Sequence, residues 1–300
     1  MTKITLIDKI REVYSRGENV MEFLKNEGDL RNDEESIMIS YDFQAGTYTK
    51  LYSKLIDYWE TYTNAVSEVW AELGPWQSAM EVGVGEGQLI APLMAKLDPE
   101  GIHDVLGFDI SWSRTRYALD NVEKAGRNAQ LFVANLFEIP LEDNAVDIVY
   151  TSHSLEPNGG REDAALNELY RVARRYVVLL EPDYAAASLE GKARMDQHGY
   201  VRDLGRHARN LGYKVVEDRS FEEISSNPLN PTRLTVIRKT EAPSASTNFV
   251  CPITRASLVR RGDVFFSPDS GLIYPVIDGL PCLMGSSATL GVHFEKFNPR

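Results

Sequence analysis

The chain has 300 residues, 43% of them hydrophobic, with two cysteines and a formal net charge of −12 at pH 7. That length allows one large core, or one core with a small appended domain. The acidity argues against nucleic-acid binding, because phosphate contacts require clustered Lys and Arg, and no apolar run approaches the about 18 residues of a membrane span. With too few cysteines for a disulfide framework, the sequence predicts a cytoplasmic protein that acts on a small molecule.

Residues 1–50 are predicted to form a helical cap or lid. Apolar side chains recur at helical spacing over residues 4–14, and a polar stretch then interrupts the pattern. A longer helix is expected over residues 51–73, with an apolar side. Three aromatic residues of this helix are assigned to the core rather than to a ligand site: Trp59, Tyr62 and Trp70.

Residues 51–240 are predicted to form the main domain, because short β-rich runs alternate with helical ones. Seven strands are expected, over 79–83, 105–109, 129–135, 146–152, 176–182, 213–221 and 233–239. Helices are expected over 87–97, 113–126, 162–175 and a region up to about 211. The alternation predicts a parallel sheet with helices on both faces, and the last two strands, which no helix separates, should form an antiparallel edge. The fold class is therefore α/β with a seven-stranded mixed sheet.

The rest of the chain is predicted to be a separate small β-rich domain. Residues 241–248 are small and polar and are interpreted as a linker. Residues 249–300 are rich in turn signals, such as SPDSG and YPVIDGLP.

A glycine-rich turn follows the first strand of the main domain, in the sequence MEVGVGEG. Glycines at such a turn let a ligand touch the backbone and lie at the N-terminus of the next helix. A dinucleotide fingerprint would need its third glycine where Gln88 stands. Alternating Gly83, Gly85 and Gly87 instead suit a ligand without a pyrophosphate, and Asp109 at the end of the second strand could bind ribose hydroxyls.

Four motifs in order resemble those of the Rossmann-like S-adenosylmethionine-dependent methyltransferases: MEVGVGEG, VLGFDIS, ANLFEIPLEDNAVDIVYTSHSLE and ALNELYRVARRYVVLLEPDY. The resemblance covers about residues 41–239 and implies a Rossmann-like fold that binds S-adenosyl-L-methionine. The cofactor-binding residues that it implies are Tyr41, Glu81, Gly83, Gly85, Gly87, Asp109, Ile110, Asn135, Leu136 and Ser152.

The resemblance also implies roles for these residues. The three glycines would lie under the methionine part of the cofactor, and Glu81 would orient their loop. Asp109 would hold the ribose, and Ile110 would pack on the adenine.

Further residues complete the implied cofactor site. Asn135 stands where many members have Asp and would accept a hydrogen bond from the adenine amino group, aided by the backbone of Leu136. Ser152 would face the methionine end. Tyr41, in the segment YDFQAGTY, is a candidate lid residue, and Tyr48 is a supporting one.

The candidate catalytic residues are His153, Glu156 and Glu181, which follow the fourth and fifth strands, where open α/β sheets bind ligands. His153 is the preferred general base because an imidazole titrates near neutral pH, although it could instead only orient its loop. Glu156 could equally bind Arg161, and Glu181 could be a buried structural carboxylate.

The tail, residues 249–284, resembles the small zinc-ribbon family that activates methyltransferases as a separate subunit. Thr254, Ser267 and Ser270 stand where the zinc-binding form has cysteines, so Cys251 alone remains and no metal is expected. Cys282 is expected to pack as a small hydrophobic residue. The tail should dock in cis, near the sheet edge or over the substrate entrance, with these apolar residues as its core: Val250, Ile253, Leu258, Phe265, Tyr274, Val276, Ile277 and Leu280.

The predicted function is methyl transfer from S-adenosylmethionine to a small-molecule acceptor, a hydroxyl of a sugar or natural-product intermediate. The Asn/Asp-Pro-Pro-Tyr motif of enzymes that methylate planar amino groups is absent after the fourth strand, where TSHSLE stands. N- or C-methylation of a metabolite stays open. The alternatives are methyl transfer to RNA or protein through the tail, and a non-catalytic protein that binds the cofactor and a partner. Homo-oligomerisation is left open.

Overall fold

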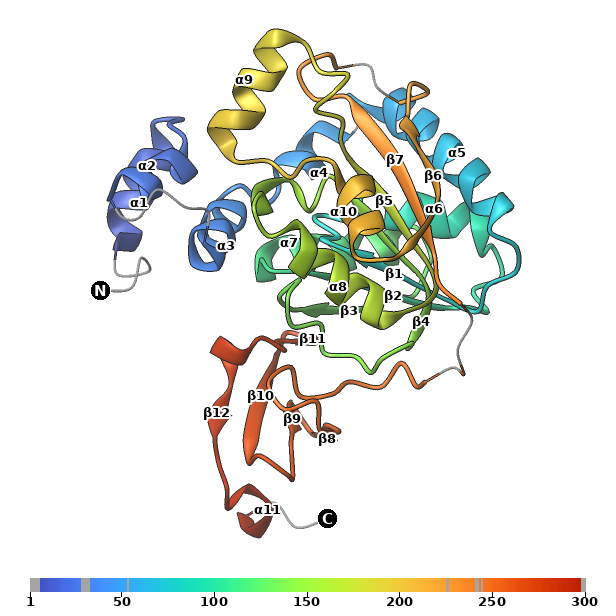
Figure 1. The fold of residues 1–300 in the computed structure, drawn as a ribbon. Helices are drawn as coiled ribbons and strands as arrows, with labels where there is room; N and C mark the ends of the chain where they lie inside the picture. The colour runs from blue at the N-terminus through green and yellow to red at the C-terminus, as the bar shows by residue number, and fades with distance from the viewer. Residues whose placement is uncertain are drawn as a thin grey trace.

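The computed structural model describes residues 6–27, 33–52, 54–224, 227–240, 243 and 245–297. Its centre is a seven-stranded sheet in the order β3-β2-β1-β4-β5-β7-β6 (Figure 1). The strands are β1 (Ser78–Val82), β2 (Asp104–Asp109), β3 (Gln130–Val133), β4 (Val146–Ser152), β5 (Ala173–Pro182), β6 (Lys214–Ser220) and β7 (Thr232–Arg238). β7 runs antiparallel to its neighbours β5 and β6. The strands β3, β2, β1, β4 and β5 each pair in parallel with the next one in this order. The predicted mixed sheet with an antiparallel edge is confirmed.

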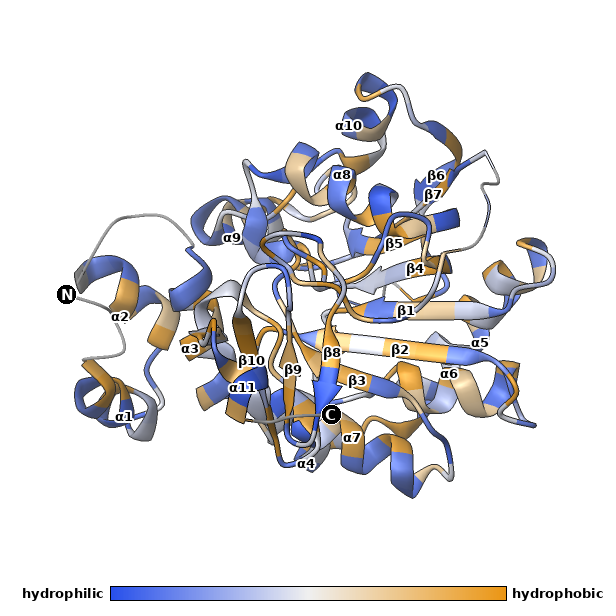
Figure 2. Cartoon of the chain, turned by 90° about the horizontal axis from the view of Figure 1, so that it is seen from below, coloured by the Kyte–Doolittle hydropathy of each residue, from blue (hydrophilic) through white to orange (hydrophobic). Residues whose placement is uncertain are grey.

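Helices cover both faces of the sheet. Buried side chains of α5 (Ile56–Glu72), α6 (Ile90–Leu97) and α7 (Trp112–Lys124) form one apolar core, and those of α8 (Glu162–Val172) and α10 (Leu204–Asn210) belong to a second. Figure 2 shows apolar residues along β2 in the parallel part of the sheet. No helix in the described part of the chain is long and apolar enough to cross a membrane.

Two of the expected helices differ from the structure. The helix predicted over residues 51–73 is divided into α4 (Thr47–Tyr52) and α5, and Ser53 between them lies outside the described residues. The helix predicted to reach residue 175 ends at Val172, because Ala173 is extended and opens β5. Arg174 then pairs with the buried Asp147 of β4, a distant contact that a helical pattern does not reveal.

The N-terminal helices form a small core of their own. α1 (Ile7–Ser15), α2 (Val20–Glu27) and α3 (Glu34–Phe43) bring together Ile10, Val13, Val20, Leu24 and Ile39. Residues 4 and 5 of the first predicted helix and residues 28–32 of the polar stretch lie outside the described residues. α3 leads directly to the centre of the molecule, where it carries Tyr41.

The tail forms a separate antiparallel sheet that docks on the edge strand β3. Its strands are β8 (Val259–Arg261), β9 (Val264–Phe266), β10 (Leu272–Ile277), β11 (Leu280–Pro281) and β12 (Thr289–Leu290), followed by α11 (Phe294–Phe297). Cys282 forms a parallel bridge with Val133, and the Leu283 amide donates to the Val133 carbonyl at 2.8 Å. The tail therefore docks in cis, at the sheet edge, as expected. Of the expected linker, residues 241, 242 and 244 lie outside the described residues.

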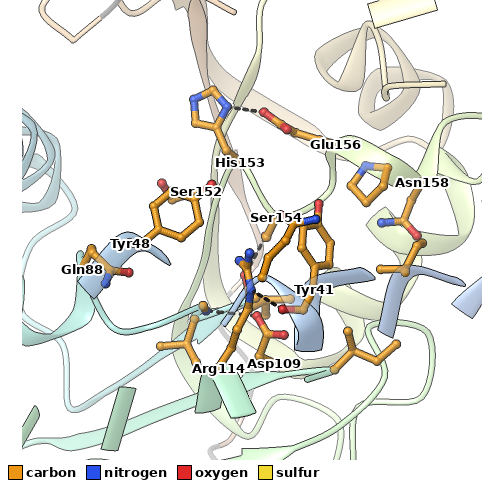
Figure 3. Close-up of a pocket in the computed structure, with 18 of the residues that line it drawn as sticks. Tyr41, Tyr48, Gln88, Asp109, Arg114, Ser152, His153, Ser154, Glu156 and Asn158 are labelled. Atoms are coloured by element: carbon orange, nitrogen blue, oxygen red, sulfur yellow. Dashed lines mark hydrogen bonds and ion pairs between the residues drawn. The ribbon is translucent and has the colours of Figure 1, made fainter. Parts of the chain in front are cut away.

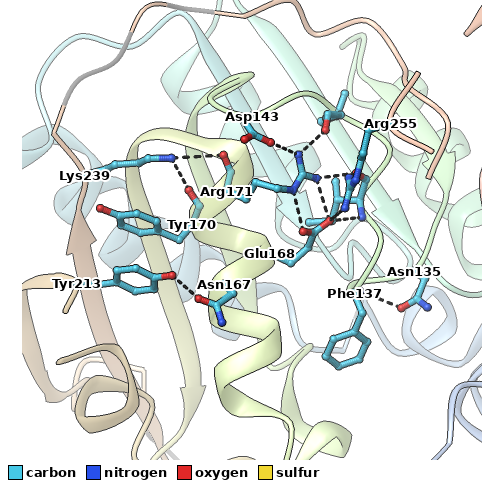
Figure 4. Close-up of polar contacts among 12 residues, drawn as sticks. Asn135, Phe137, Asp143, Asn167, Glu168, Tyr170, Arg171, Tyr213, Lys239 and Arg255 are labelled. Atoms are coloured by element: carbon cyan, nitrogen blue, oxygen red, sulfur yellow. Dashed lines mark hydrogen bonds and ion pairs between the residues drawn. The ribbon is translucent and has the colours of Figure 1, made fainter. Parts of the chain in front are cut away.

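A partly buried ionic network joins the tail to α8 (Figure 4). Glu168 accepts hydrogen bonds from Arg171 and from Arg255 of the tail at 2.9 and 2.8 Å. Arg255 also donates to the Ile139 carbonyl at 2.6 Å. Together these contacts fix the tail against the loop that follows β3.

The expected core of the tail is only partly correct. Val250, Tyr274 and Leu280 are buried, but Ile253 and Ile277 are 54% and 49% exposed, so their assignment to the core is wrong. Both side chains lie at the surface of the tail and not in its interior. The thiol of Cys251 lies 3.1 Å from the hydroxyl of Tyr274, and no group of three metal-ligating side chains occurs among the described residues.

Candidate functional site

A cavity of about 770 Å³ opens beyond the carboxyl ends of the central strands (Figure 3). It brings together eleven of the thirteen site residues predicted from the sequence: Tyr41, Glu81, Gly83, Gly85, Asp109, Ile110, Asn135, Leu136, Ser152, His153 and Glu156. Gly87 and Glu181 do not line it. A Cβ on Gly87 would lie 3.1 Å from the Cα of Ala118, so Gly87 permits the close packing of the turn on α7.

The glycine turn forms one end of the cavity. Gly83 and Gly85 have φ angles of 73° and 53°, in the left-handed region that favours glycine. A Cβ on Gly83 would lie 2.2 Å from the Cβ of Ser154, so no larger residue fits there. The turn therefore presents bare backbone to the cavity.

Asp109, at the end of β2, stabilises this turn through hydrogen bonds. Its two carboxylate oxygens accept hydrogen bonds from the Gly85 amide at 3.0 Å and the Ser111 amide at 2.9 Å. Burial raises the pKa of Asp109, while the charge of Arg114 and these amides oppose the rise. Each oxygen keeps a second lone pair, so the carboxylate can still accept hydrogen bonds from a ligand.

Hydrogen bonds within the domain hold Glu81, Ser152 and Asn135 in place. Tyr150 donates to Glu81 at 3.0 Å, and burial raises the pKa of Glu81 to about 8. Ser152 lies 2.7 Å from the hydroxyl of Tyr62. The amide oxygen of Asn135 accepts from the backbone amide of Phe137 at 3.0 Å, which shapes the loop after β3.

The lid segment lies over the glycine turn. The Arg114 guanidinium stacks on Tyr41, with 4.5 Å between its Cζ and the ring centroid, and lies 5.2 Å from the centroid of Tyr48. Its Nε–H donates to the Tyr41 carbonyl at 3.1 Å. Tyr48 is 45% exposed, so it covers the outer side of this stack.

Two carboxylates that the sequence did not single out attach the lid to the domain. Glu86 accepts from the backbone amides of Gly46, Tyr48 and Thr49 at 2.9, 3.3 and 2.7 Å. Asp42 accepts from the Ser111 hydroxyl at 2.7 Å, beside the N-terminus of α7. Both contacts join residues far apart in the chain, so no local pattern could have revealed them.

The opposite end of the cavity holds a polar cluster around His153. Its Nδ1 lies 2.6 Å from Glu156, and its Nε2 lies 2.8 Å from the Thr232 hydroxyl. Burial alone would lower the pKa of His153, but the hydrogen bond and charge of Glu156, with the charge of Glu181, raise it overall. His153 has a φ of 51°, a strained conformation for a residue with a side chain, which is typical of functional sites.

The two carboxylates of this region have different surroundings. Glu156 also accepts from the Asn230 side chain at 2.8 Å, and although burial would raise its pKa, the contact with His153 lowers it overall. Glu181 is 2% exposed and accepts from the amides of Ser154 and Leu155 at 3.1 and 3.2 Å. Burial raises the pKa of Glu181 to about 7. Glu181 thus supports the loop behind the cavity.

Aromatic side chains of α5 form the remaining wall. Tyr58, Trp59 and Tyr62 all line the cavity, with ring centroids 5.3 to 5.9 Å apart. The core assignment holds for Trp70, which is 2% exposed, whereas Trp59 and Tyr62 pack with the main core and also line the cavity. The helical spacing of these aromatics was visible in the sequence, but the side that faces a cavity was not.

Comparison with known proteins identifies the domain type. Residues 79–175 match the family model described as a methyltransferase domain. No curated protein matches the sequence significantly. Magnesium protoporphyrin IX methyltransferase from Synechocystis PCC 6803 with bound SAH is 15% identical, with a TM-score of 0.51 and coverage of 69% of this chain and 100% of that one. The structure of the same enzyme with bound SAM is 16% identical, with a TM-score of 0.50 and coverage of 71% of this chain and 100% of that one. A SAM-dependent methyltransferase from Aquifex aeolicus is 19% identical, with a TM-score of 0.44 and coverage of 58% of this chain and 89% of that one.

Proposed function

Because this chain carries a methyltransferase domain of the S-adenosylmethionine-dependent class, we propose that it transfers a methyl group to a hydroxyl of a small molecule. The observation that carries the proposal is one cavity that joins a glycine turn and a buried acid at one end to a His153–Glu156 pair at the other. The first end suits the cofactor, and the second suits an acceptor that must lose a proton.

The residues at the first end fit S-adenosylmethionine. Gly83 and Gly85 leave room for a ligand chain on the backbone, and Asp109 keeps free lone pairs for two ribose hydroxyls. In this proposal Ile110 and Leu136 enclose the adenine between them. Further cofactor contacts are assigned to Tyr41, Glu81, Asn135 and Ser152. When bound, the cofactor supplies an electrophilic methyl group on a sulfonium.

The aromatic wall supports a planar acceptor. Tyr58, Trp59 and Tyr62 offer ring faces and edges along one side of the cavity, where a flat ring gains both apolar burial and aromatic contacts. Asn230 also lines the cavity, and its amide oxygen is buried without a partner in the described part of the chain. A hydroxyl on the acceptor would satisfy that oxygen, since leaving it unpaired costs about 1–3 kcal/mol.

His153 is proposed as the general base. A hydroxyl that takes a methyl group must release its proton, and the Nε2 of His153 would accept it after the Thr232 hydroxyl gives up this position. Glu156 at Nδ1 would fix the ring and stabilise the imidazolium that forms. Glu181 is then a positioning residue, because it holds the backbone of the loop and does not line the cavity.

The test is a transfer assay with S-adenosylmethionine that carries an isotopically labelled methyl group. The acceptors should be matched sets with one scaffold and different groups: phenols, anilines, benzoates and saturated polyols. We expect labelled methyl ethers from planar hydroxylated rings, together with S-adenosylhomocysteine. Products only from amines or carboxylates would refute the hydroxyl acceptor, and cofactor binding without transfer to any class would favour a non-catalytic role.

A further inference from the structure

Arg114 is a buried cation at the border of the lid and the glycine turn. It is 7% exposed, yet no carboxylate among the described residues forms an ion pair with it. Its Nε–H donates to the Tyr41 carbonyl, and its Nη2 is buried without a hydrogen-bond partner in the same part of the chain. A guanidinium has five N–H donors, so the two on Nη2 can serve a ligand.

The surroundings of Arg114 hold the guanidinium in place over the turn. Tyr41 and Tyr48 stack against it from the lid, and its Nη1 lies 3.9 Å from the position that a Cβ on Gly85 would occupy. Figure 3 shows Arg114 above Asp109, on the cofactor side of the cavity and away from His153. The cation therefore faces the part of the cavity that the glycine turn encloses.

A buried charge is costly unless an opposite charge compensates for it. Asp109 compensates for part of this charge, since the charge of Arg114 opposes the rise in the pKa of Asp109. No ion pair joins the two side chains, and the Asp109 oxygens accept hydrogen bonds from the amides of Gly85 and Ser111. S-adenosylmethionine has one carboxylate, at its amino-acid end, and a guanidinium can bind a carboxylate through two parallel hydrogen bonds. We propose that Arg114 binds this carboxylate and thereby selects intact S-adenosylmethionine and S-adenosylhomocysteine over their decarboxylated forms.

This inference rests on the proposed position of the cofactor and does not depend on the acceptor. It also gives the lid a role, since the residue that would hold the carboxylate is the one on which Tyr41 and Tyr48 stack. A variant of Arg114 could loosen the lid and weaken every ligand to the same extent. The experiment must therefore compare ligands and not only variants.

We would measure by calorimetry the binding of S-adenosylhomocysteine and of decarboxylated S-adenosylhomocysteine to the full chain. The variants are R114Q, R114K and, as a matched control, K124Q, which removes an exposed charge from the other end of α7. In the wild type, loss of the carboxylate should weaken binding about 10–100-fold, as expected for charged hydrogen bonds. In R114Q this ratio should fall to within about threefold, and K124Q should keep the wild-type ratio.

R114K keeps the charge but loses the planar fork, so it should reduce the ratio several-fold, and it decides the question if R114Q does not fold. If the ratio of the two affinities is unchanged in the Arg114 variants, this inference is overturned and the proposed cofactor site is not. Unchanged affinities for both ligands would also overturn the inference. A wild type that binds neither ligand would overturn the proposed cofactor site and this inference with it.

Discussion

Phe249→Ala tests whether the tail stabilises the methyltransferase domain. Phe249 is 5% exposed, and its ring centroid lies 4.9 Å from that of Phe132 in β3 and 5.3 Å from that of Phe265 in the tail. Removing the ring loses a transfer free energy of about 2–3 kcal/mol and two aromatic contacts of about 0.5–1.5 kcal/mol each. The free energy of unfolding should therefore fall by about 3–5 kcal/mol, the usual cost of truncating a buried Phe.

The assay is urea denaturation followed by tryptophan fluorescence, with thermal melting as a second measurement. Ile253→Ala is the matched control, because Ile253 belongs to the same tail but is 54% exposed. That control should change the free energy of unfolding by no more than about 0.5 kcal/mol. For a domain of this size, the loss in Phe249→Ala corresponds to a fall in Tm of roughly 6–20 °C.

A loss below about 1 kcal/mol in Phe249→Ala, or one equal to that of the control, would refute the reasoning. So would a separate early transition for the tail that leaves the main transition unchanged. Either result would mean that the tail is attached to the domain without stabilising it.

The remaining predictions concern the cavity. Asp109→Ala should weaken S-adenosylmethionine binding by about 1.5–3 kcal/mol in calorimetry, and an unchanged affinity would contradict its assignment. Gly83→Ala should abolish cofactor binding, because its Cβ would meet Ser154 at 2.2 Å; normal binding would place the site elsewhere. His153→Gln should lower turnover roughly 10²–10⁴-fold with cofactor binding retained, and a loss below about tenfold would show that His153 is not the base. A neutral imidazole is the active form, so turnover should rise as the pH increases through the raised pKa of His153. Glu156→Gln removes the group that raises this pKa, so the rising limb of the pH–rate profile should move to lower pH; a fixed limb would assign it to another group.

The sheet could be predicted because its information is local. Apolar runs of strand length alternate with helical patterns, and the absence of a helix before residues 233–239 indicated the antiparallel edge. The approach of Asp109 to the glycine turn could also be predicted, since parallel strands end at the same edge of a sheet. In the structure this approach is the 3.0 Å hydrogen bond from Gly85 to Asp109.

The residues that could not be predicted act through long-range contacts. Arg114 belongs to an ordinary helical pattern, and only the lid makes it a buried cation. Arg174 is a good helix former, but its partner Asp147 lies in another strand and favours extended backbone. Trp59 follows the spacing of a core residue, and the cavity beside it depends on how α5 packs.

Glu86 couples three backbone amides of the lid through one side chain. One carboxylate from the glycine turn holds three amides at the start of α4, so none of the three can be released alone without leaving the others poorly placed. In hydrogen exchange these three amides should therefore become accessible together, at one common rate.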